Sequence, residues 1–425
     1  MDKLSLLDVL RSETAPSLGV TEPGAVALAC AAASDNNGID TRQVELIVSP
    51  NIFKNCMAVG IPGINIKGIK AAAALGAVGG DHRKGLEALA GADSGSLEAC
   101  GRLLADGAVS VEISGNGELL YIEAICTGAK GGGRCIIQGG HTRMVYLERD
   151  GVVLVDGRPE ATEKEVRPHP LAGVTVADIL AWLETASVEE LDFLREAADM
   201  NLQAARWGLA NRPGMGAGAS LQAWVERGRV PDSLSMDLQA HTAAASDARV
   251  SGSQVRVMTC TGSGNHGITA IVPVARAAER LGIPDERRLR ALALSVAITI
   301  YIKHHSGRLS GMCGCGVASA TGVACALTYL QGGSPRQVED SIQNMAGGIT
   351  GMICDGAKEG CSLKLAAAVA AAVTASMLAL DGVVVPGDNG ILADRCERTM
   401  ANMGEVSARG MAPTDAVILA IMQEE

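Results

Sequence analysis

The chain has 425 residues, of which 48% are hydrophobic and 20% charged, enough to bury one or two substantial cores without disulfides or structural metals. Its net charge of −11 would repel a phosphate backbone, and no basic cluster offsets that charge, so nucleic acid is not an expected partner. Aromatic residues make up only 2%, so we expect helices to approach closely through small side chains.

The ends and apolar windows of the chain predict a cytoplasmic protein with no membrane partner. Residues 1–5 lead directly into an amphipathic stretch and lack the apolar core and cleavage site of a signal peptide. The window 365–380 is mostly alanine and falls short of the ~20 strongly apolar residues that a bilayer span needs, so it predicts a buried core helix. In a reducing cytosol, the twelve cysteines indicate metal binding, redox chemistry or burial as small hydrophobes.

The first 155 residues predict one helix followed by a sheet. Thr21-Glu22-Pro23 opens a helix that runs to about residue 37, because Thr suits the N-cap and Pro the first turn. The β-branched run 44–48 predicts a strand, and the polar, turn-rich segment 49–55 predicts a loop that is a site candidate. From 109 to 155, short alternating runs joined by turns at 114–117 and 150–151 predict an antiparallel sheet built from hairpins.

The remainder predicts helices. Residues 187–190 form a capping box for one long helix. Periodic Ala- and Leu-rich stretches predict further helices at 286–303, 316–331, 335–346, 363–380 and 413–422. The expected fold class is α+β, with a large all-helical, Ala-rich domain and a smaller α/β domain with an antiparallel sheet. The expected domains are a helical segment 1–40 that joins the C-terminal domain, a smaller α+β domain 41–165, and a helical domain 166–425.

Two glycine-rich stretches around cysteines, 310–316 and 351–361, are candidates for an iron–sulfur site. Glycine lets the backbone approach an inorganic cluster and leaves N–H donors for its sulfurs. Cys313 and Cys361 stand at predicted helix starts, where the dipole favours thiolate. The spacing leaves two alternatives open. The glycines could merely permit close helix packing, or the cysteines could bind zinc, although the usual cysteine pairs and histidines of a zinc site are missing.

A second constellation, 261–267, lies between the strand-like run 255–258 and a helix that begins near 268. Strand, glycine loop and helix start form a nest of N–H groups that suits a carboxylate, and the Lys-Ser/Thr ending of a Walker loop is missing. A tight loop without a ligand is the alternative. Arg249 could bind a carboxylate bidentately or belong to a solvated turn, and His304-His305 could be a base site or a partly exposed helix end.

With these residues identified, the sequence resembles the L-cysteine desulfidase family, which is related to the helical domain of oxygen-sensitive iron–sulfur L-serine dehydratases. The match covers nearly the whole chain. It rests on Thr21-Glu22-Pro23, on 48–51 with Lys54-Asn55, on Gly139-Gly140-His141-Thr142, on 245–249, on Ser263-Gly264-Asn265 and on 351–357.

The resemblance implies a [4Fe–4S] cluster held by Cys313, Cys354 and Cys361, with one iron left open for the substrate. It implies β-elimination that converts L-cysteine to hydrogen sulfide, ammonia and pyruvate, or L-serine dehydration on the same scaffold. The catalytic candidates are Glu22, Lys54 and His266. The substrate-binding candidates are Thr21, Asn51, Asn55, His141, Thr142, Arg249, Ser263, Gly264 and Asn265. The expected partner is a small amino-acid substrate, and a homodimer remains open.

One position departs from the family pattern. Members of the desulfidase family usually read Gly-Cys-Thr-Glu-Pro, whereas this chain has Val20 in place of the cysteine. We expect Val20 to point towards the cluster pocket and to alter turnover or the leaving group. Two other functions stay open: a pyridoxal-phosphate eliminase with Lys54 as the Schiff-base amine and 261–267 holding the phosphate, and a non-catalytic cluster-binding protein.

Overall fold

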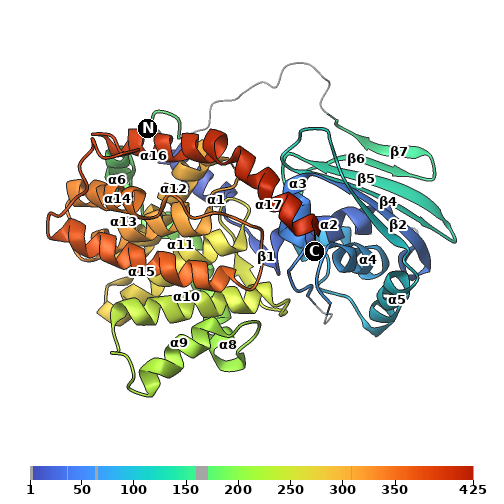
Figure 1. Cartoon of the computed structure of the whole chain (residues 1–425), viewed down its shortest axis with the longest axis horizontal. Coiled ribbons are helices and arrows are strands. Elements are labelled where there is room, and N and C mark those ends of the chain that lie inside the picture. Colours follow the sequence, from blue (N-terminus) through green and yellow to red (C-terminus); the bar gives the residue numbers. More distant parts are fainter. Residues whose placement is uncertain (1–2, 36, 63–65, 159–170, 308, 425) are drawn as a thin grey trace.

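The protein, described here by a computed structural model, consists of two halves that lie side by side (Figure 1). The structure describes residues 3–35, 37–62, 66–158, 171–307 and 309–424. Each half has its own large apolar core, and the α+β class is confirmed.

The helical half contains α1 (Lys3–Ser12), α6 (Val176–Thr185), α7 (Val188–Leu191), α8 (Phe193–Asn211), α9 (Ala217–Glu226), α10 (Leu234–Val250), α11 (Gly264–Leu281), α12 (Asp285–Ser306), α13 (Ala320–Leu330), α14 (Pro335–Ile349), α15 (Cys361–Leu380), α16 (Cys396–Glu405) and α17 (Ala412–Glu424). The smaller half contains α2 (Thr21–Ala33), β2 (Thr41–Val48), α3 (Pro50–Cys56), α4 (Ile69–Gly79), α5 (Ser94–Ala105), β3 (Val109–Ile113), β4 (Tyr121–Gly128), β5 (Gly131–Gln138), β6 (Met144–Arg149) and β7 (Val152–Asp156). A short antiparallel pair, β1 (Pro16–Leu18) with β8 (Arg256–Met258), joins the N-terminal segment to the helical half.

Small residues let the helices approach one another as predicted. A Cβ on Gly208 of α8 would lie 2.7 Å from the carbonyl carbon of Ala244 on α10, so these two helices touch backbone to backbone. A Cβ on Gly76 of α4 would lie 2.6 Å from the Cα of Ala27 on α2. Side chains would keep both pairs apart, which explains why the cores are rich in glycine and alanine.

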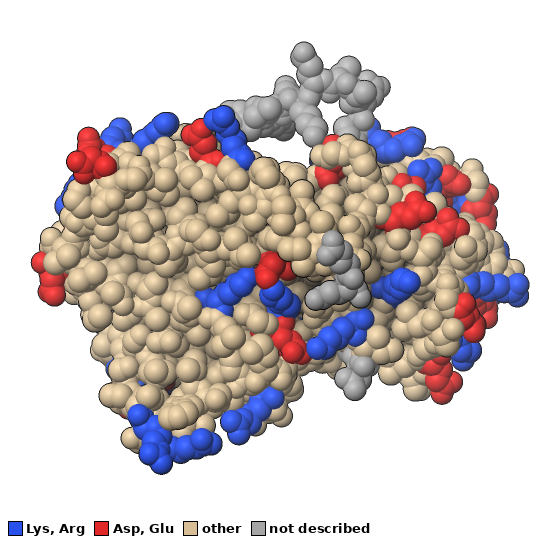
Figure 2. All heavy atoms as spheres, viewed as in Figure 1, with Lys and Arg blue, Asp and Glu red and all other residues tan. Residues whose placement is uncertain are grey.

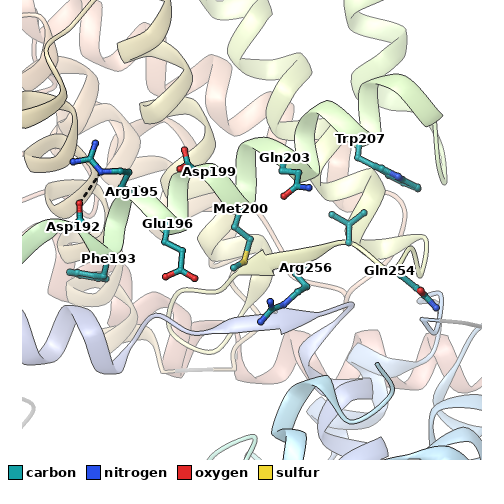
Figure 3. A pocket seen from close by; sticks show the side chains of 11 residues that line it. Asp192, Phe193, Arg195, Glu196, Asp199, Met200, Gln203, Trp207, Gln254 and Arg256 are labelled. Carbon is teal, nitrogen blue, oxygen red and sulfur yellow. Dashed lines mark hydrogen bonds and ion pairs between the residues drawn. The ribbon is translucent and has the colours of Figure 1, made fainter. Parts of the chain in front are cut away.

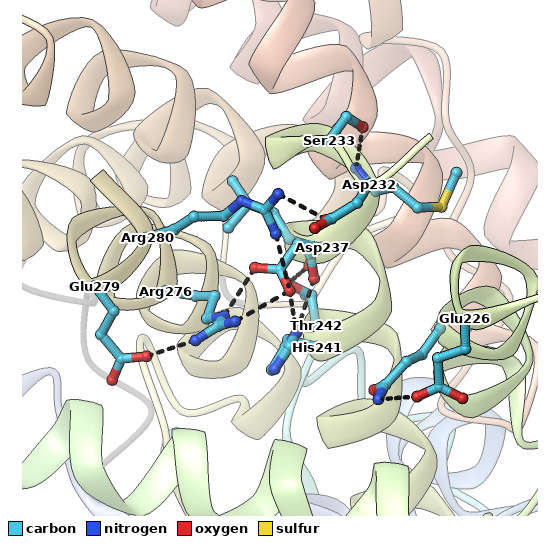
Figure 4. Close-up of polar contacts among 12 residues, drawn as sticks. Glu226, Asp232, Ser233, Asp237, His241, Thr242, Arg276, Glu279 and Arg280 are labelled. Atoms are coloured by element: carbon cyan, nitrogen blue, oxygen red, sulfur yellow. Dashed lines mark hydrogen bonds and ion pairs between the residues drawn. The ribbon is translucent and has the colours of Figure 1, made fainter. Parts of the chain in front are cut away.

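A charged network holds α10 against α11 (Figure 4). Arg276 donates from Nε to Asp237 Oδ2 at 2.8 Å, and Arg280 donates to Asp232 Oδ1 at 2.6 Å. Asp237 also lies 3.3 Å from Nδ1 of His241. The network ties the start of α10 to the end of α11, whereas Arg249 and His266 lie at the other ends of these two helices.

The smaller half is built around a six-stranded sheet in the order β3-β2-β4-β5-β6-β7, with α2 and α4 packed on one face. The turn at 150–151 joins β6 and β7 as a hairpin, as predicted. The sheet is mixed rather than antiparallel, because β2 lies between β3 and β4 and pairs in parallel with β3. The turn at 114–117 therefore does not close a hairpin.

The N-terminal 40 residues divide between the halves. Helix α1 packs in the helical core through Leu6 and Leu10. Helix α2 buries its alanine-rich surface against the sheet, because after its first turn the helix is apolar on every side and must be covered. The predicted border at residue 165 lies outside the described residues.

Local predictions failed at two further points. The segment 49–55, predicted to be a loop, forms α3 with Pro50 in its first turn, where proline is tolerated. The capping box at Ser187 is present, but it starts the short α7, and α8 follows directly after it.

One helix among the described residues, α15, is long and apolar enough by composition to cross a membrane. Half of its apolar window is buried within the protein, where α15 packs on α10, α13 and α14. The packing is that of the predicted core helix.

Candidate active site between the two halves

The two glycine–cysteine segments lie side by side. Met312 and Ile353 form an antiparallel bridge. On either side of it, the N–H of Cys313 donates to the carbonyl of Met352 at 2.8 Å, and the N–H of Cys354 donates to that of Gly311 at 2.7 Å. The bridge brings together two cysteines that are far apart in the sequence.

Two more cysteines lie close to this bridge. Cys361 is the first residue of α15, as predicted from its position before an Ala-rich run. Cys315 begins a π-helical turn, Cys315–Ser319. This form of helix is rare in proteins, and where it occurs it is often at a functional site. Cys313, Cys315, Cys354 and Cys361 all line one cavity at the junction of the two halves.

The four thiols have different electrostatic surroundings. A hydrogen bond from Cys315, the N–H of Gly316 at 3.4 Å, and the charges of Lys364 and Lys303 lower the pKa of Cys313 to about 6, although burial opposes this. Burial and the neighbouring Cys313 and Cys354 raise the pKa of Cys361 to about 11. One thiolate is therefore favoured before any metal enters.

These residues fit an iron–sulfur cluster by their donor set. Thiolates are the usual ligands of such clusters, and peptide N–H groups commonly face the sulfurs. Among the described residues, no three His, Cys, Asp or Glu side chains are grouped around a single metal ion. Ligands of a cluster lie farther apart, because each thiolate binds a different iron.

The smaller half contributes a buried carboxylate to the same cavity. Glu22, in the first turn of α2, accepts a hydrogen bond from Asn55 Nδ2 at 3.0 Å and lies 3.8 Å from His141 Nε2. Burial opposes ionisation of this carboxyl, but His141 and the Arg249 charge outweigh burial and lower the pKa of Glu22. Glu22 is thus a carboxylate at neutral pH.

Arg249, from the last turn of α10, is only 1% exposed and lines the cavity. It donates from Nε to the carbonyl of Gly19 at 3.0 Å and from Nη2 to Thr21 Oγ1 at 3.3 Å. A Cβ at Gly264 would lie 2.8 Å from Cδ and Cζ of Arg249. The glycine at this helix start therefore makes room for the guanidinium.

His266 is oriented by a strained residue. Thr261 has φ +49°, a left-handed conformation that is an outlier for a β-branched residue. Its hydroxyl lies 2.6 Å from His266 Nδ1. On the other side, a Cβ at Gly314 would lie 2.8 Å from Cε1 of His266. The imidazole therefore borders the segment that carries Cys313 and Cys315, and backbone strain of this kind is typical of functional sites.

The structure brings together most of the predicted site residues. Those that line the cavity are Glu22, Asn51, Lys54, Asn55, Arg249, Ser263, Asn265, His266, Cys313, Cys354 and Cys361.

Four predicted residues lie elsewhere. Thr21, His141 and Gly264 are behind the lining, in contact with Arg249 or Glu22, and Thr142 is exposed on the surface. The expectation that Val20 faces the pocket is wrong, because Val20 packs in the apolar core of the smaller half.

Sequence reasoning missed two lysines in the lining, Lys303 and Lys364, whereas Cys315 belongs to the predicted cysteine segment 310–316 and also lines the cavity. Lys303 immediately precedes the histidine pair 304–305, and it is the lysine that faces inward from α12. A lysine directly after the apolar run 291–302 could have been noticed. The orientation of Lys364 depends on how α15 docks, which no local signal reveals.

A larger groove of about 750 Å³ lies along α8 (Figure 3) and shares no lining residue with this cavity. Phe193, Met200 and Trp207 line it together with charged side chains, including Arg256, which is paired with Glu87 at 2.5 Å. None of the residues lining this groove is a cysteine or a histidine. The chemistry-bearing groups are therefore concentrated in the narrower cavity between the halves.

Comparisons with known proteins identify the family of this chain. Residues 138–420 match the family described as serine dehydratase alpha chain. Proteins named as UPF0597 proteins from Alkaliphilus oremlandii, Caldanaerobacter subterraneus and Methanocella arvoryzae are 39%, 41% and 38% identical to this chain. The alignments cover 98%, 99% and 99% of this chain and 97%, 98% and 98% of these relatives. The chain therefore belongs to the serine dehydratase alpha chain family, which supports a lyase-like function.

Proposed function

We propose that this protein is a lyase that eliminates the β-substituent of a small amino acid, L-cysteine or L-serine. From L-cysteine and one water the net products are pyruvate, ammonia and hydrogen sulfide. From L-serine they are pyruvate and ammonia, because the water released by elimination is taken up again when the imine hydrolyses. The observation that carries the proposal is the cavity itself, where four thiols face ionisable and amide groups from both halves.

We assign the [4Fe–4S] cluster to Cys313, Cys354 and Cys361, with Cys315 beside them. Three ligands suffice if one iron stays open to the substrate. When bound, the cluster supplies a Lewis acid for the leaving group. Lys303 and Lys364, which line the same cavity, would offset the negative charge of the thiolates.

The substrate's two charged groups match two sets of side chains. Arg249 keeps N–H donors beyond those used by Gly19 and Thr21, so it can bind the α-carboxylate. Ser263 and Asn265 add polar groups at the start of α11, where the helix dipole favours an anion. The Glu22 carboxylate, held by Asn55, suits the α-ammonium group.

His266 is the best-placed residue to remove the α-proton. Glu22 has a lowered pKa and is therefore a weak base. The His266 ring is held through Nδ1 by Thr261, so that Nε2 is directed towards Gly314 and the cysteine segment. A base oriented in this way can take a proton from a substrate lying between Arg249 and the thiols.

The test is anaerobic purification followed by iron and sulfide analysis and a pyruvate assay with L-cysteine, D-cysteine and L-serine. We expect about one cluster per chain and pyruvate from an L-amino acid. Cys354→Ala should lose both the cluster and activity. The control Cys325→Ala, which removes a thiol buried in the helical core, should keep both.

Two outcomes would contradict the proposal. Iron-free protein with full activity would remove the cluster from the mechanism. Cluster-loaded protein that forms no pyruvate from any of these amino acids would refute the substrate class. The visible spectrum distinguishes the proposed cluster from the pyridoxal-phosphate alternative. Borohydride would bleach the absorption of an aldimine, whereas air would bleach that of a cluster.

A further inference from the structure

The C-terminal helix α17 reaches from the helical half to the smaller half and lies beside α3 (Figure 1). Little apolar packing holds it there. Among its side chains from 412 to 423, only Ile418 is buried, and Val417 is 59% exposed. Something other than hydrophobic burial must fix the position of this helix.

An ion pair to a buried lysine supplies that contact. Lys54 Nζ lies 2.5 Å from Asp415 Oδ1, and the two side chains are 3% and 25% exposed. Lys54 Nζ also donates to the carbonyl of Cys354 at 3.4 Å. A buried ammonium is costly unless a carboxylate faces it. Asp415 therefore offsets the charge of a lysine that lines the cavity.

The Asp415 carboxylate also lies close to the segment that precedes Cys313. A Cβ at Gly311 would lie 2.8 Å from the carbonyl oxygen of Met411 and 3.5 Å from Asp415 Oδ1. The glycine thus allows the start of α17 to pack directly on this strand-like segment. Asp415 is therefore paired with the lysine of the smaller half and lies close to Gly311, in the segment before the cysteines.

We propose that Asp415 is a positioning residue of the site: it fixes the Lys54 ammonium on the cavity wall and thereby makes α17 a clamp between the two halves. The catalytic consequence rests on the function proposed above, but the placement of Lys54 does not. Loss of the carboxylate should free both Lys54 and α17, since few apolar contacts remain to hold the helix.

The experiment compares Asp415→Asn, which removes the charge at equal size, with Asp415→Glu, which keeps it. Acetylation of Lys54 in a short pulse of an N-hydroxysuccinimide ester is followed by mass spectrometry, and hydrogen exchange of α17 is measured in parallel. We expect acetylation and exchange to rise at least ~10-fold in Asp415→Asn, with partial recovery in Asp415→Glu. The exposed Asp388→Asn serves as a matched control and should behave as wild type.

A double-mutant cycle with Lys54→Met isolates the pair. In the Lys54→Met background, Asp415→Asn should no longer change the exchange of α17. Unchanged Lys54 acetylation in Asp415→Asn, or an equal effect of this variant with and without Lys54, would overturn the proposal. If substrate turnover is found, Asp415→Asn should lower kcat more than it raises KM. If turnover is absent, the proposed function fails while the labelling result still decides the role of Asp415.

Discussion

Replacing Gly264 by alanine should dislodge Arg249. The added Cβ would lie 2.8 Å from both Cδ and Cζ of the guanidinium side chain, closer than carbon atoms approach without overlap. Arg249 is 1% exposed and is held by Gly19 and Thr21 at 3.0 and 3.3 Å. It cannot retreat without breaking these two hydrogen bonds.

The size of the effect follows from those bonds. A hydrogen bond of a charged group contributes ~1.5–3 kcal/mol, and both bonds are at risk. Alanine in place of glycine in a helix returns up to ~1 kcal/mol. The free energy of unfolding should therefore fall by ~2–5 kcal/mol, and KM should rise at least ~10-fold because the carboxylate loses its anchor.

The matched control is Gly348→Ala in α14, where a Cβ meets nothing within 4 Å. It should keep wild-type KM and gain up to ~1 kcal/mol of stability. Anaerobic urea denaturation and the pyruvate assay measure both quantities. If Gly264→Ala matched this control in stability and KM, Arg249 would not be pinned as described, and its role as carboxylate anchor would have to be abandoned.

Three further predictions concern the strained turn, the buried carboxylate and the thiols. Thr261→Gly should remove ~1–3 kcal/mol of backbone strain, yet it should lower kcat because His266 loses its hydrogen-bond partner. Thr261→Ser keeps the hydroxyl and should keep activity. Equal kcat in both variants would argue against a role of Thr261 in orienting His266. Because the pKa of Glu22 is lowered in the folded state from 4.5, its stabilisation is complete above the unfolded pKa and is lost as pH falls through the folded pKa. Urea denaturation between pH 7 and 3 should show a steeper loss for wild type than for Glu22→Gln, and parallel curves would contradict this. In iron-free protein, the pH dependence of alkylation should place the Cys313 pKa near 6, as against about 11 for Cys361; similar profiles for both thiols would be inconsistent with the local charges.

Several elements followed from local signals in the sequence. The Ala-rich periodicity predicted α15, with Cys361 at its start. The glycine stretch 261–267 predicted a helix after it, near 268, and α11 is present but begins earlier, at Gly264 within that stretch. The failures came where tertiary contacts override local preference: the turn-rich segment 49–55 forms α3 because it packs at the junction of the halves, and a Cβ on Gly356 would lie 3.1 Å from the carbonyl carbon of Lys54.

The sequence by itself determined the helical periods, the glycines beside the cysteines and the chemical types available to the site, because these properties depend on neighbouring residues along the chain. Only the tertiary structure decided which of them meet. The bridge between Met312 and Ile353 joins two cysteine segments, and Asp415 reaches Lys54 across 361 positions of sequence. Such pairings depend on how two separate cores dock, and the sequence around a residue does not show whether docking turns its side chain inward. Lys364 and Asp415 therefore became visible as site residues only in the folded chain.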